Sequence, residues 1–237
     1  ANNSYSGGTL IAAGTLQLGA GGNTGSIQGN VTNQGTLAFN RADDVTFSNI
    51  ISGAGGVNQL GPGTLHVNGD QTYTGPTQVL GGTFALGGTL QSNTVTVSPG
   101  ATLSGTGTVN GDVINQGRLW PGEPVAGSTS YGSFTVHGNY VGQNGVLELN
   151  TFLGSDGSPS NRLVIDGGVG SGNTSVVVHN TSTSSSATTA DGILLVSAIN
   201  GATTTADVFN LPGELRSGAL DYRLFRGSKD GTLADNW

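Results

Sequence analysis

Two stretches of the chain repeat each other at long range, and this repetition constrains the fold more than any other feature. Residues 5–19 follow the pattern Tyr-x-Gly-x-Thr and then Gly-Thr, and the same pattern returns in residues 73–87. A second pair, residues 29–37 and 111–119, shares Gly-x-Val-x-Asn-Gln-Gly-x-Leu at a different separation. Units that recur along a chain are the signature of repeat architectures, and the unequal separations indicate loops of varying length.

Short runs of alternating polar and apolar residues occur within and between these units. Residues 64–67, 83–86 and 94–97 are examples, each with Gly, Asn or Pro at or near its ends. A period of two over four residues predicts a β-strand. Strands this short have no core of their own, but coils stacked in register bury a column of Val, Leu and Ile between them.

The composition agrees with many short strands joined by tight turns. Glycine supplies 43 of the 237 residues and shows no three-residue period, which excludes both a helical fold and collagen. The net charge of −7 is too small to make the chain disordered by composition. The absence of cysteine removes disulfides and zinc–thiolate sites. With 7 basic against 14 acidic side chains, the chain is also a poor partner for nucleic acid.

We therefore predict an all-β fold, a right-handed parallel β-helix with a C-terminal cap built from a β-hairpin or a sandwich-like unit. The separation of the first repeat pair corresponds to about three coils of roughly 20 to 25 residues each. An antiparallel β-sandwich also has many short strands and is the alternative. It does not account for near-identical units at long range or for glycines that recur at turn positions.

The distribution of charge changes near residue 110. Residues 1–110 hold four charged side chains, and the other 17 lie in residues 111–237. We expect a repeat stalk over residues 1–110 and a capping region of the same solenoid over residues 111–237. Residues 220–225 alternate and are followed by a turn at 227–231, which predicts a closing hairpin. An uncapped solenoid end exposes its core and an edge for pairing.

No residue pattern predicts a catalytic, cofactor or metal site. The histidines His66, His137 and His179 each lie in or beside a strand pattern, and a solvated turn explains the adjacent acidic pair Asp43 and Asp44. The chain has no Gly-x-Ser-x-Gly motif, no His-x-x-x-His spacing, no Gly-Gly-x-Gly-x-Asp calcium repeat and no phosphate-binding loop. We expect a protein that is not an enzyme and needs no cofactor.

The repeats and the later segments together resemble a known family. The Tyr-x-Gly-x-Thr and Gly-Thr-Leu-x-Leu-Gly units are similar to the β-strand repeats of bacterial autotransporter passenger domains. From residue 105 onward the chain resembles the C-terminal passenger region of the pertactin type, in residues 105–109, 132–140, 156–167, 191–193, 209–211, 222–225 and 235–237. One departure is the stretch 123–131, which is longer than the family's usual passage after Leu-x-Pro-Gly.

The resemblance implies a segment that is secreted through a Gram-negative outer membrane and reaches the cell surface or the extracellular space. Its C-terminal part is then an autochaperone that folds first and templates the coils behind it. The implied partners are upstream passenger coils and the protein's own outer-membrane β-barrel, which is absent from this chain. The alternative function is adhesion, in which exposed loops at 123–131 and 181–189 bind a host glycan or protein, or the solenoids associate with each other.

Specific residues are predicted for the cap. We expect the buried folding nucleus to be formed by late-strand residues, namely Leu163, Val164, Ile165, Tyr222, Leu224 and Phe225. Trp120 lies beside a Pro-Gly turn and either seals the junction between two coils or stacks on a sugar. We favour the seal. The chain opens at Ala1 with neither a signal peptide nor an apolar membrane span, and we expect it to be part of a larger protein.

Overall fold

The computed structural model describes residues 2–184 and 186–237, and within these residues the chain forms 25 β-strands and no helix. Three sheets are parallel and one is an antiparallel pair. The short parallel sheet contains β1 (Thr9–Ile11), β3 (Val31–Asn33) and β6 (Ile51–Ser52). The five-stranded sheet contains β11 (Thr89–Leu90), β14 (Thr108–Val109), β17 (Ser133–Val136), β19 (Arg162–Asp166) and β21 (Val196–Ile199).

The 15-stranded sheet supplies two faces of the molecule. Its order runs along one face to β18, turns there, and returns along the other face. The first face holds β2 (Thr15–Gly22), β4 (Thr36–Arg41), β7 (Gly56–Gln59), β9 (Thr77–Val79), β12 (Thr94–Val97) and β15 (Asp112–Asn115). The second face holds β16 (Arg118–Pro121), β13 (Thr102–Gly105), β10 (Thr83–Leu86), β8 (Thr64–Val67) and β5 (Val45–Thr46). The long strands β18 (Tyr140–Thr151) and β20 (Val169–Asn180) cross both faces, and β22 (Thr203–Thr204) and β23 (Phe209–Asn210) pair with β20.

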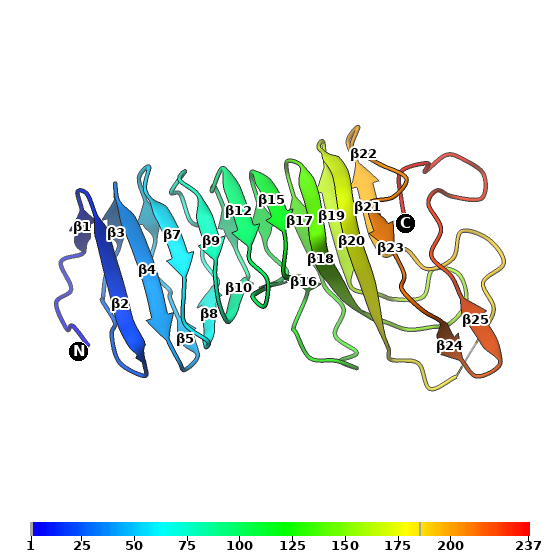
Figure 1. Cartoon of the computed structure of the whole chain (residues 1–237), viewed down its shortest axis with the longest axis horizontal. Helices are drawn as coiled ribbons and strands as arrows, with labels where there is room; N and C mark the ends of the chain where they lie inside the picture. Colours follow the sequence, from blue (N-terminus) through cyan, green and yellow to red (C-terminus); the bar gives the residue numbers. More distant parts are fainter. Residues whose placement is uncertain (1, 185) are drawn as a thin grey trace.

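Successive coils stack in register along the long axis of the molecule, which confirms the parallel β-helix (Figure 1). Thr83 pairs with Thr64 of the preceding coil and with Thr102 of the next. One coil therefore takes 19 residues here, slightly fewer than the expected range. The stack continues without a break across residue 110, because β14 pairs with β17 and β12 pairs with β15. The division at that residue stays a prediction.

The core is a column of inward-facing side chains from each coil. Leu37, Val57, Val95 and Val113 are fully buried, and the strand register places them one above another on the first face. Thr77 continues the same column between Val57 and Val95, and its hydroxyl lies 2.6 Å from that of Tyr73 and 3.0 Å from that of Ser92. The polar member of the column is thus hydrogen-bonded, as a buried hydroxyl requires.

Glycine allows neighbouring coils to approach closely at the turns. Gly105 has a φ of +108°, and a Cβ atom at this residue would lie 2.0 Å from the carbonyl oxygen of Leu86. Gly172 has a φ of +85°, and its Cβ would lie at the same distance from the carbonyl oxygen of Gly142. No other residue fits such a position, which explains part of the glycine content.

A hairpin covers the C-terminal end, but its turn differs from the predicted one. Strands β24 (Leu215–Ser217) and β25 (Leu220–Tyr222) pair antiparallel, with Ser217 opposite Leu220. The turn is therefore formed by Gly218 and Ala219, and Gly218 has a φ of +59°, which a tight hairpin turn accommodates. The chain does turn at 227–231, where the N–H of Gly231 donates to the carbonyl oxygen of Ser228. The prediction that this turn forms the closing hairpin was wrong, because the strand that ends at Tyr222 already has its partner on the N-terminal side.

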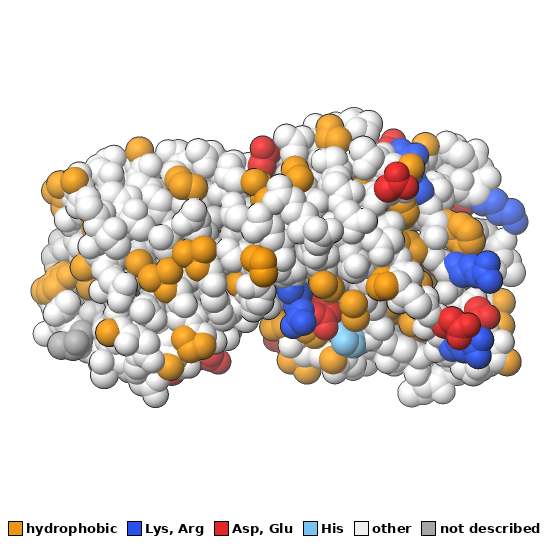
Figure 2. Space-filling view, in the orientation of Figure 1, with side chains coloured by type: hydrophobic (Ala, Val, Ile, Leu, Met, Phe, Trp, Pro, Cys, Tyr) orange, Lys and Arg blue, Asp and Glu red, His pale blue; other side chains and the backbone are white. Residues whose placement is uncertain are grey.

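Charged side chains gather over the C-terminal half of the face shown in Figure 2, whereas the stalk is largely uncharged there. Within residues 2–184 and 186–237, no helix is long and apolar enough to cross a membrane.

Candidate functional site: the C-terminal cap

The end of the chain is hydrogen-bonded to the last strand of the five-stranded sheet. The carbonyl oxygen of Trp237 accepts from the backbone N–H groups of Leu195 (2.8 Å) and Val196 (3.0 Å), and its own N–H donates to Val196 (2.9 Å). The side-chain oxygen of Asn236 accepts from the N–H of Ala198 at 2.9 Å. Residues 236 and 237 therefore cover the edge of β21, which would otherwise be open to pairing with another strand.

Three aromatic rings form a column at this end of the solenoid. The rings of Tyr140 and Phe209 stack with centroids 5.6 Å apart, and Phe209 meets Trp237 edge to face at the same separation. All three side chains are buried. The hydroxyl of Tyr140 lies 3.0 Å from both the amide nitrogen of Asn115 and the hydroxyl of Thr174, and burial raises the pKa of Tyr140 to about 12. The column links β18, β23 and the terminal segment, which are distant in sequence.

The buried hydroxyl of Thr204 joins the terminal segment to the body of the cap. It accepts hydrogen bonds from Nε1 of Trp237 (3.0 Å) and Nε of Arg226 (3.1 Å), and it donates to the carbonyl oxygen of Asp235 (2.9 Å). The carboxylate of Asp235 accepts from the N–H of Thr204 at 2.7 Å and from Arg226 at 2.5 Å. The Thr204 N–H and the Arg226 guanidinium hold the pKa of the Asp235 carboxyl below its usual value.

A carboxylate also fixes the loop that precedes β21. Asp156 accepts hydrogen bonds from the backbone N–H groups of Thr189 (2.8 Å), Ala190 (3.0 Å) and Gly192 (2.8 Å). These donors stabilise the ionised form and lower the pKa of Asp156 to about 2. The loop predicted as a binding element, 181–189, is thus bonded at its far end, and its residue 185 lies outside the described residues.

The predicted cap residues divide into three groups. Leu163 and Ile165 are fully buried on β19, and Leu224 packs against the same hydrophobic core from the segment after β25. Val164 is half-buried, because it alternates with its two buried neighbours along the strand. Tyr222 is also half-buried, and its hydroxyl lies 2.6 Å from the carbonyl oxygen of Ser186 and 3.0 Å from that of Leu153.

The expectation that Phe225 is buried was wrong. Its side chain is 71% exposed. Leu224 faces the core, and adjacent residues of an extended segment point in opposite directions, so Phe225 points outward. The role of these six residues as a folding nucleus stays a prediction. Sequence reasoning assigned no individual role to Phe209, Thr204 or Asp156, although 156–167 and 209–211 are among the segments that resemble the family.

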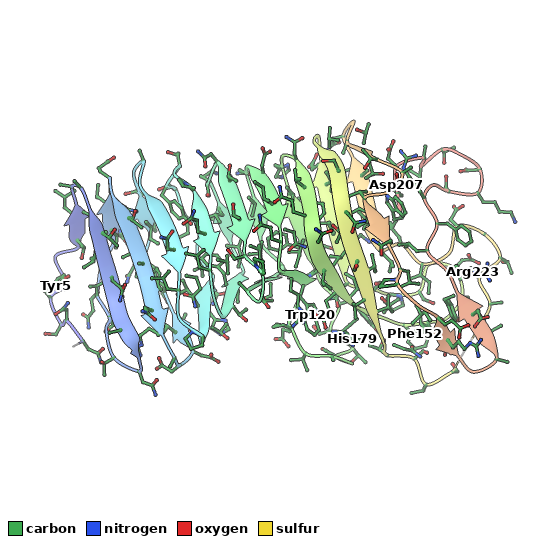
Figure 3. All side chains as sticks on the ribbon, in the orientation of Figure 1. Tyr5, Trp120, Phe152, His179, Asp207 and Arg223 are labelled. Carbon is green, nitrogen blue, oxygen red and sulfur yellow. The ribbon has the colours of Figure 1, made fainter. Side chains whose placement is uncertain are left out.

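Trp120 lies on β16 and belongs to a cluster on the outer face of the solenoid, which it forms with Glu148 on β18 and His179 on β20. Its ring is buried and stacks on the ring of His179, with centroids 5.2 Å apart and an angle of 15° between the planes (Figure 3). Glu148, on the strand between them, forms an ion pair with Nε of Arg118 at 2.5 Å and contacts Nε2 of His179 at 2.6 Å. The imidazole of His179 therefore covers one face of the indole. This favours the alternative in which Trp120 seals the junction between coils, rather than the one in which its ring stacks on a sugar. The seal itself stays a prediction.

The loop that departs from the family pattern is anchored to the same face. The amide of Asn150 on β18 donates to the carbonyl oxygen of Val125 (2.9 Å) and accepts from the N–H of Gly127 (2.8 Å).

Across residues 2–184 and 186–237, no group of three or more His, Asp or Glu side chains is arranged to hold a metal ion. Packing of buried side chains and hydrogen bonds hold the cap together.

Comparison with known proteins places this architecture in a family. The model described as Autochaperone Domain Type 1 matches residues 122–224, which span β17 to β25. The model described as Passenger-associated-transport-repeat matches residues 1–18 and 57–86 in the stalk. The chain belongs to the autotransporter passengers. Autotransporter passengers are secreted through the outer membrane to the cell surface or the extracellular space, and this passenger shares that localisation.

Relatives of this passenger are larger proteins. It is 35% identical to the "Adhesin BmaC autotransporter" of Brucella suis biovar 1 (strain 1330) over 100% of its own length and 7% of that protein. It is 30% identical to the "Probable autotransporter YfaL" of Escherichia coli (strain K12) over 95% of its length and 20% of that protein. A match to the "Extracellular serine protease" of Serratia marcescens, also at 35% identity, covers 41% of the passenger and 10% of that protein. The passenger thus spans a small part of each relative.

Proposed function

We propose that residues 111–237 act as the autochaperone of this passenger, and that residues 1–110 form a stalk that folds onto it. The observation that carries the proposal is the closed C-terminal end, where the Tyr140–Phe209–Trp237 column and the bonded terminus cover the core and the edge of β21. The autochaperone family model matches residues 122–224, which include Tyr140, Phe209 and β21 but not Trp237.

The mechanism follows from the one-dimensional order of the fold. Each coil of a solenoid contacts its two neighbours, so folding can begin at one stable end and spread coil by coil. A closed cap supplies that end, and the free edge of its first coil offers a parallel template in register to the coil upstream. A cap that folds as it emerges from the outer membrane resists sliding back and draws the rest of the passenger outward. In the full protein its partners are the upstream coils and the protein's own outer-membrane β-barrel.

Limited proteolysis of the whole chain in graded urea tests the proposal. The surviving fragments are identified by mass at each urea concentration. We expect a fragment that spans roughly residues 111–237 to outlast the coils of residues 1–110. A Thr204→Val variant, which removes the hydroxyl that holds Trp237, should lose this difference. Loss of both halves at the same urea concentration in the unaltered chain would contradict the proposal.

Adhesion is a second candidate function, and the relative named as an adhesin favours it because the similarity covers the whole chain. The candidate contact surfaces are the loops 123–131 and 181–189, with a host glycan, a host protein or a second copy of the passenger as partner. Saturable binding of the purified chain to host cells, lost when either loop is shortened, supports this function. Absence of binding by the folded chain would assign adhesion elsewhere in the full protein. We infer a role without enzymatic activity for either function.

A further inference from the structure

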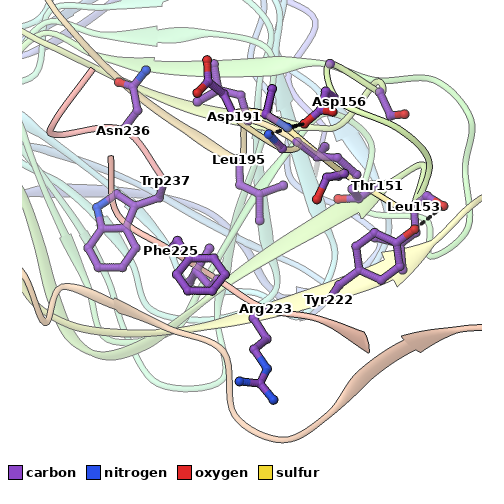
Figure 4. Close-up of a pocket in the computed structure, with 18 of the residues that line it drawn as sticks. Thr151, Leu153, Asp156, Asp191, Leu195, Tyr222, Arg223, Phe225, Asn236 and Trp237 are labelled. Carbon is purple, nitrogen blue, oxygen red and sulfur yellow. Dashed lines mark hydrogen bonds between the residues drawn. The ribbon is translucent and has the colours of Figure 1, made fainter. Parts of the chain in front are cut away.

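A cavity of about 860 Å³ lies between the last coil of the solenoid and the hairpin β24–β25. Figure 4 shows residues from the loop after β18, from the loop before β21, and from the terminal segment around it. Much of its wall is apolar and includes Leu153, Val178, Leu195, Leu211, Leu224 and Trp237. Its volume falls in the range of roughly 300–1,000 Å³ that is typical of small-molecule sites.

Most charged groups around the cavity already have partners within the protein. Asp156 accepts three backbone N–H groups, as described above, and Asp191 accepts the N–H of Lys229 at 2.8 Å. Asp221 accepts from Nε of Arg216 at 2.8 Å, and the ammonium group of Lys229 donates to the carbonyl oxygen of Thr189 at 2.9 Å. The carboxylates are therefore satisfied and do not call for a cation.

Arg162 is different. It lines the cavity from the start of β19, its side chain is partly buried, and its Nε atom is buried without a hydrogen-bond partner. Within the described parts of the chain, its guanidinium has neither an ion pair nor a hydrogen bond. The other guanidinium on the cavity wall, that of Arg223, is directed away from the cavity in Figure 4.

A guanidinium that has no partner within the protein and lies beside an apolar cavity attracts an anion to that cavity. Burial of a charge without a partner is unfavourable, and arginine stays protonated at any relevant pH. Its planar group binds a carboxylate with two parallel hydrogen bonds. The apolar wall selects for a hydrocarbon chain next to that head group. The two observations together specify an anionic amphiphile.

We propose that the cavity binds a long-chain carboxylate, with its head group on Arg162 and its alkyl tail against the leucines and Trp237. This site is independent of the autochaperone role. A tail buried in this way predicts a chain-length dependence, because each additional buried CH₂ group tightens binding by roughly fourfold. Octanoate should therefore bind more weakly than decanoate by roughly 15-fold, and the difference should come from the dissociation rate.

Isothermal titration of the whole folded chain tests the site with defined probes. Decanoate, decanol and decylammonium share one tail and differ in the head group. We expect one decanoate to bind per chain, and the other two to bind at least tenfold more weakly. Arg162→Met, which keeps the length of the stem and removes the charge, should weaken decanoate at least tenfold. The matched control is Arg118→Met, because neither Arg118 nor its ion-pair partner Glu148 lines the cavity, and it should bind like the unaltered protein.

A second variant tests the apolar wall separately. Leu211→Phe fills part of the cavity and leaves Arg162 in place, so it should weaken decanoate while the protease resistance of the cap is retained. Several outcomes would overturn the proposal: no saturable binding of decanoate, equal binding of decanol, tighter binding of decylammonium, or unchanged affinity in Arg162→Met. If Arg162→Met does not fold, the comparison of the three probes on the unaltered chain still decides the question.

Discussion

Replacement of Phe209 by alanine removes the central ring of the aromatic column. Phe209 is 3% exposed and contacts both Tyr140 and Trp237, so its truncation leaves a cavity that the neighbouring rings cannot fill. A buried Phe→Ala change costs about 3–5 kcal/mol. The matched control is Phe84→Ala in the stalk, because Phe84 is 1% exposed and lies on β10. The two changes have the same chemistry and comparable burial, and they differ in which end of the solenoid they affect.

The two variants should differ in kinetics more than in equilibrium stability. If the cap is the folding nucleus, about 0.5–0.8 of the free energy of unfolding that Phe209→Ala removes appears as a higher activation free energy of folding. For a loss of about 4 kcal/mol, refolding slows by roughly 30- to 200-fold. At Phe84 the fraction should be below about 0.3, so refolding slows by less than about tenfold and unfolding accelerates instead. Refolding and unfolding are followed by far-UV circular dichroism after dilution from, or into, urea.

If the same fraction of the lost free energy appeared in the folding rate of both variants, the reasoning would be refuted. A larger fraction for Phe84→Ala would place the nucleus in the stalk. Phe209→Leu retains most of the apolar side chain and provides a milder perturbation if the alanine variant does not refold. The ratio of the kinetic to the equilibrium effect should be the same for both substitutions at Phe209, because both report on one site.

Three further predictions concern the polar contacts of the cap. Thr204→Val leaves Nε1 of buried Trp237 without an acceptor and should lower the free energy of unfolding by about 1–3 kcal/mol in urea titrations; an unchanged midpoint would contradict this role. The pKa of Asp156 is lowered to about 2, so the hydrogen bonds of its carboxylate are fully present above about pH 4 and are lost as the pH falls towards 2. Hydrogen exchange of the loop amides that bond Asp156 should therefore accelerate between about pH 4 and 2. Asp156→Asn should abolish this pH dependence. Glu148→Gln should cost about 1–2 kcal/mol by chemical denaturation, less than the roughly 3–5 kcal/mol of a fully buried pair, because its partners Arg118 and His179 remain partly exposed; a cost below about 0.5 kcal/mol would show that the cluster is not structural.

The fold follows from local sequence patterns far better than the cap does. The four-residue alternations at 64–67, 83–86 and 94–97 are strands β8, β10 and β12, because each lies in a coil whose neighbours present the same pattern in register. The same local logic placed Leu163 and Ile165 in the core.

The cap depends on contacts that no local pattern records. Asp156 meets its loop partners 33 to 36 residues away, and the hydroxyl of Thr204 meets Trp237 at a separation of 33 residues. The irregular segment after β25 has no neighbouring coil to fix its alternation, which is why the outward direction of Phe225 could not be read from a run of apolar residues.

The order in which the coils fold is the most direct test of the autochaperone account. Pulsed hydrogen exchange during refolding of the whole chain, read by mass spectrometry of peptides, reports when each strand gains protection. The account predicts that amides of β18 to β21 become protected before those of β3, β4 and β7. Protection that appears first in the stalk, or at the same time along the whole solenoid, would contradict it.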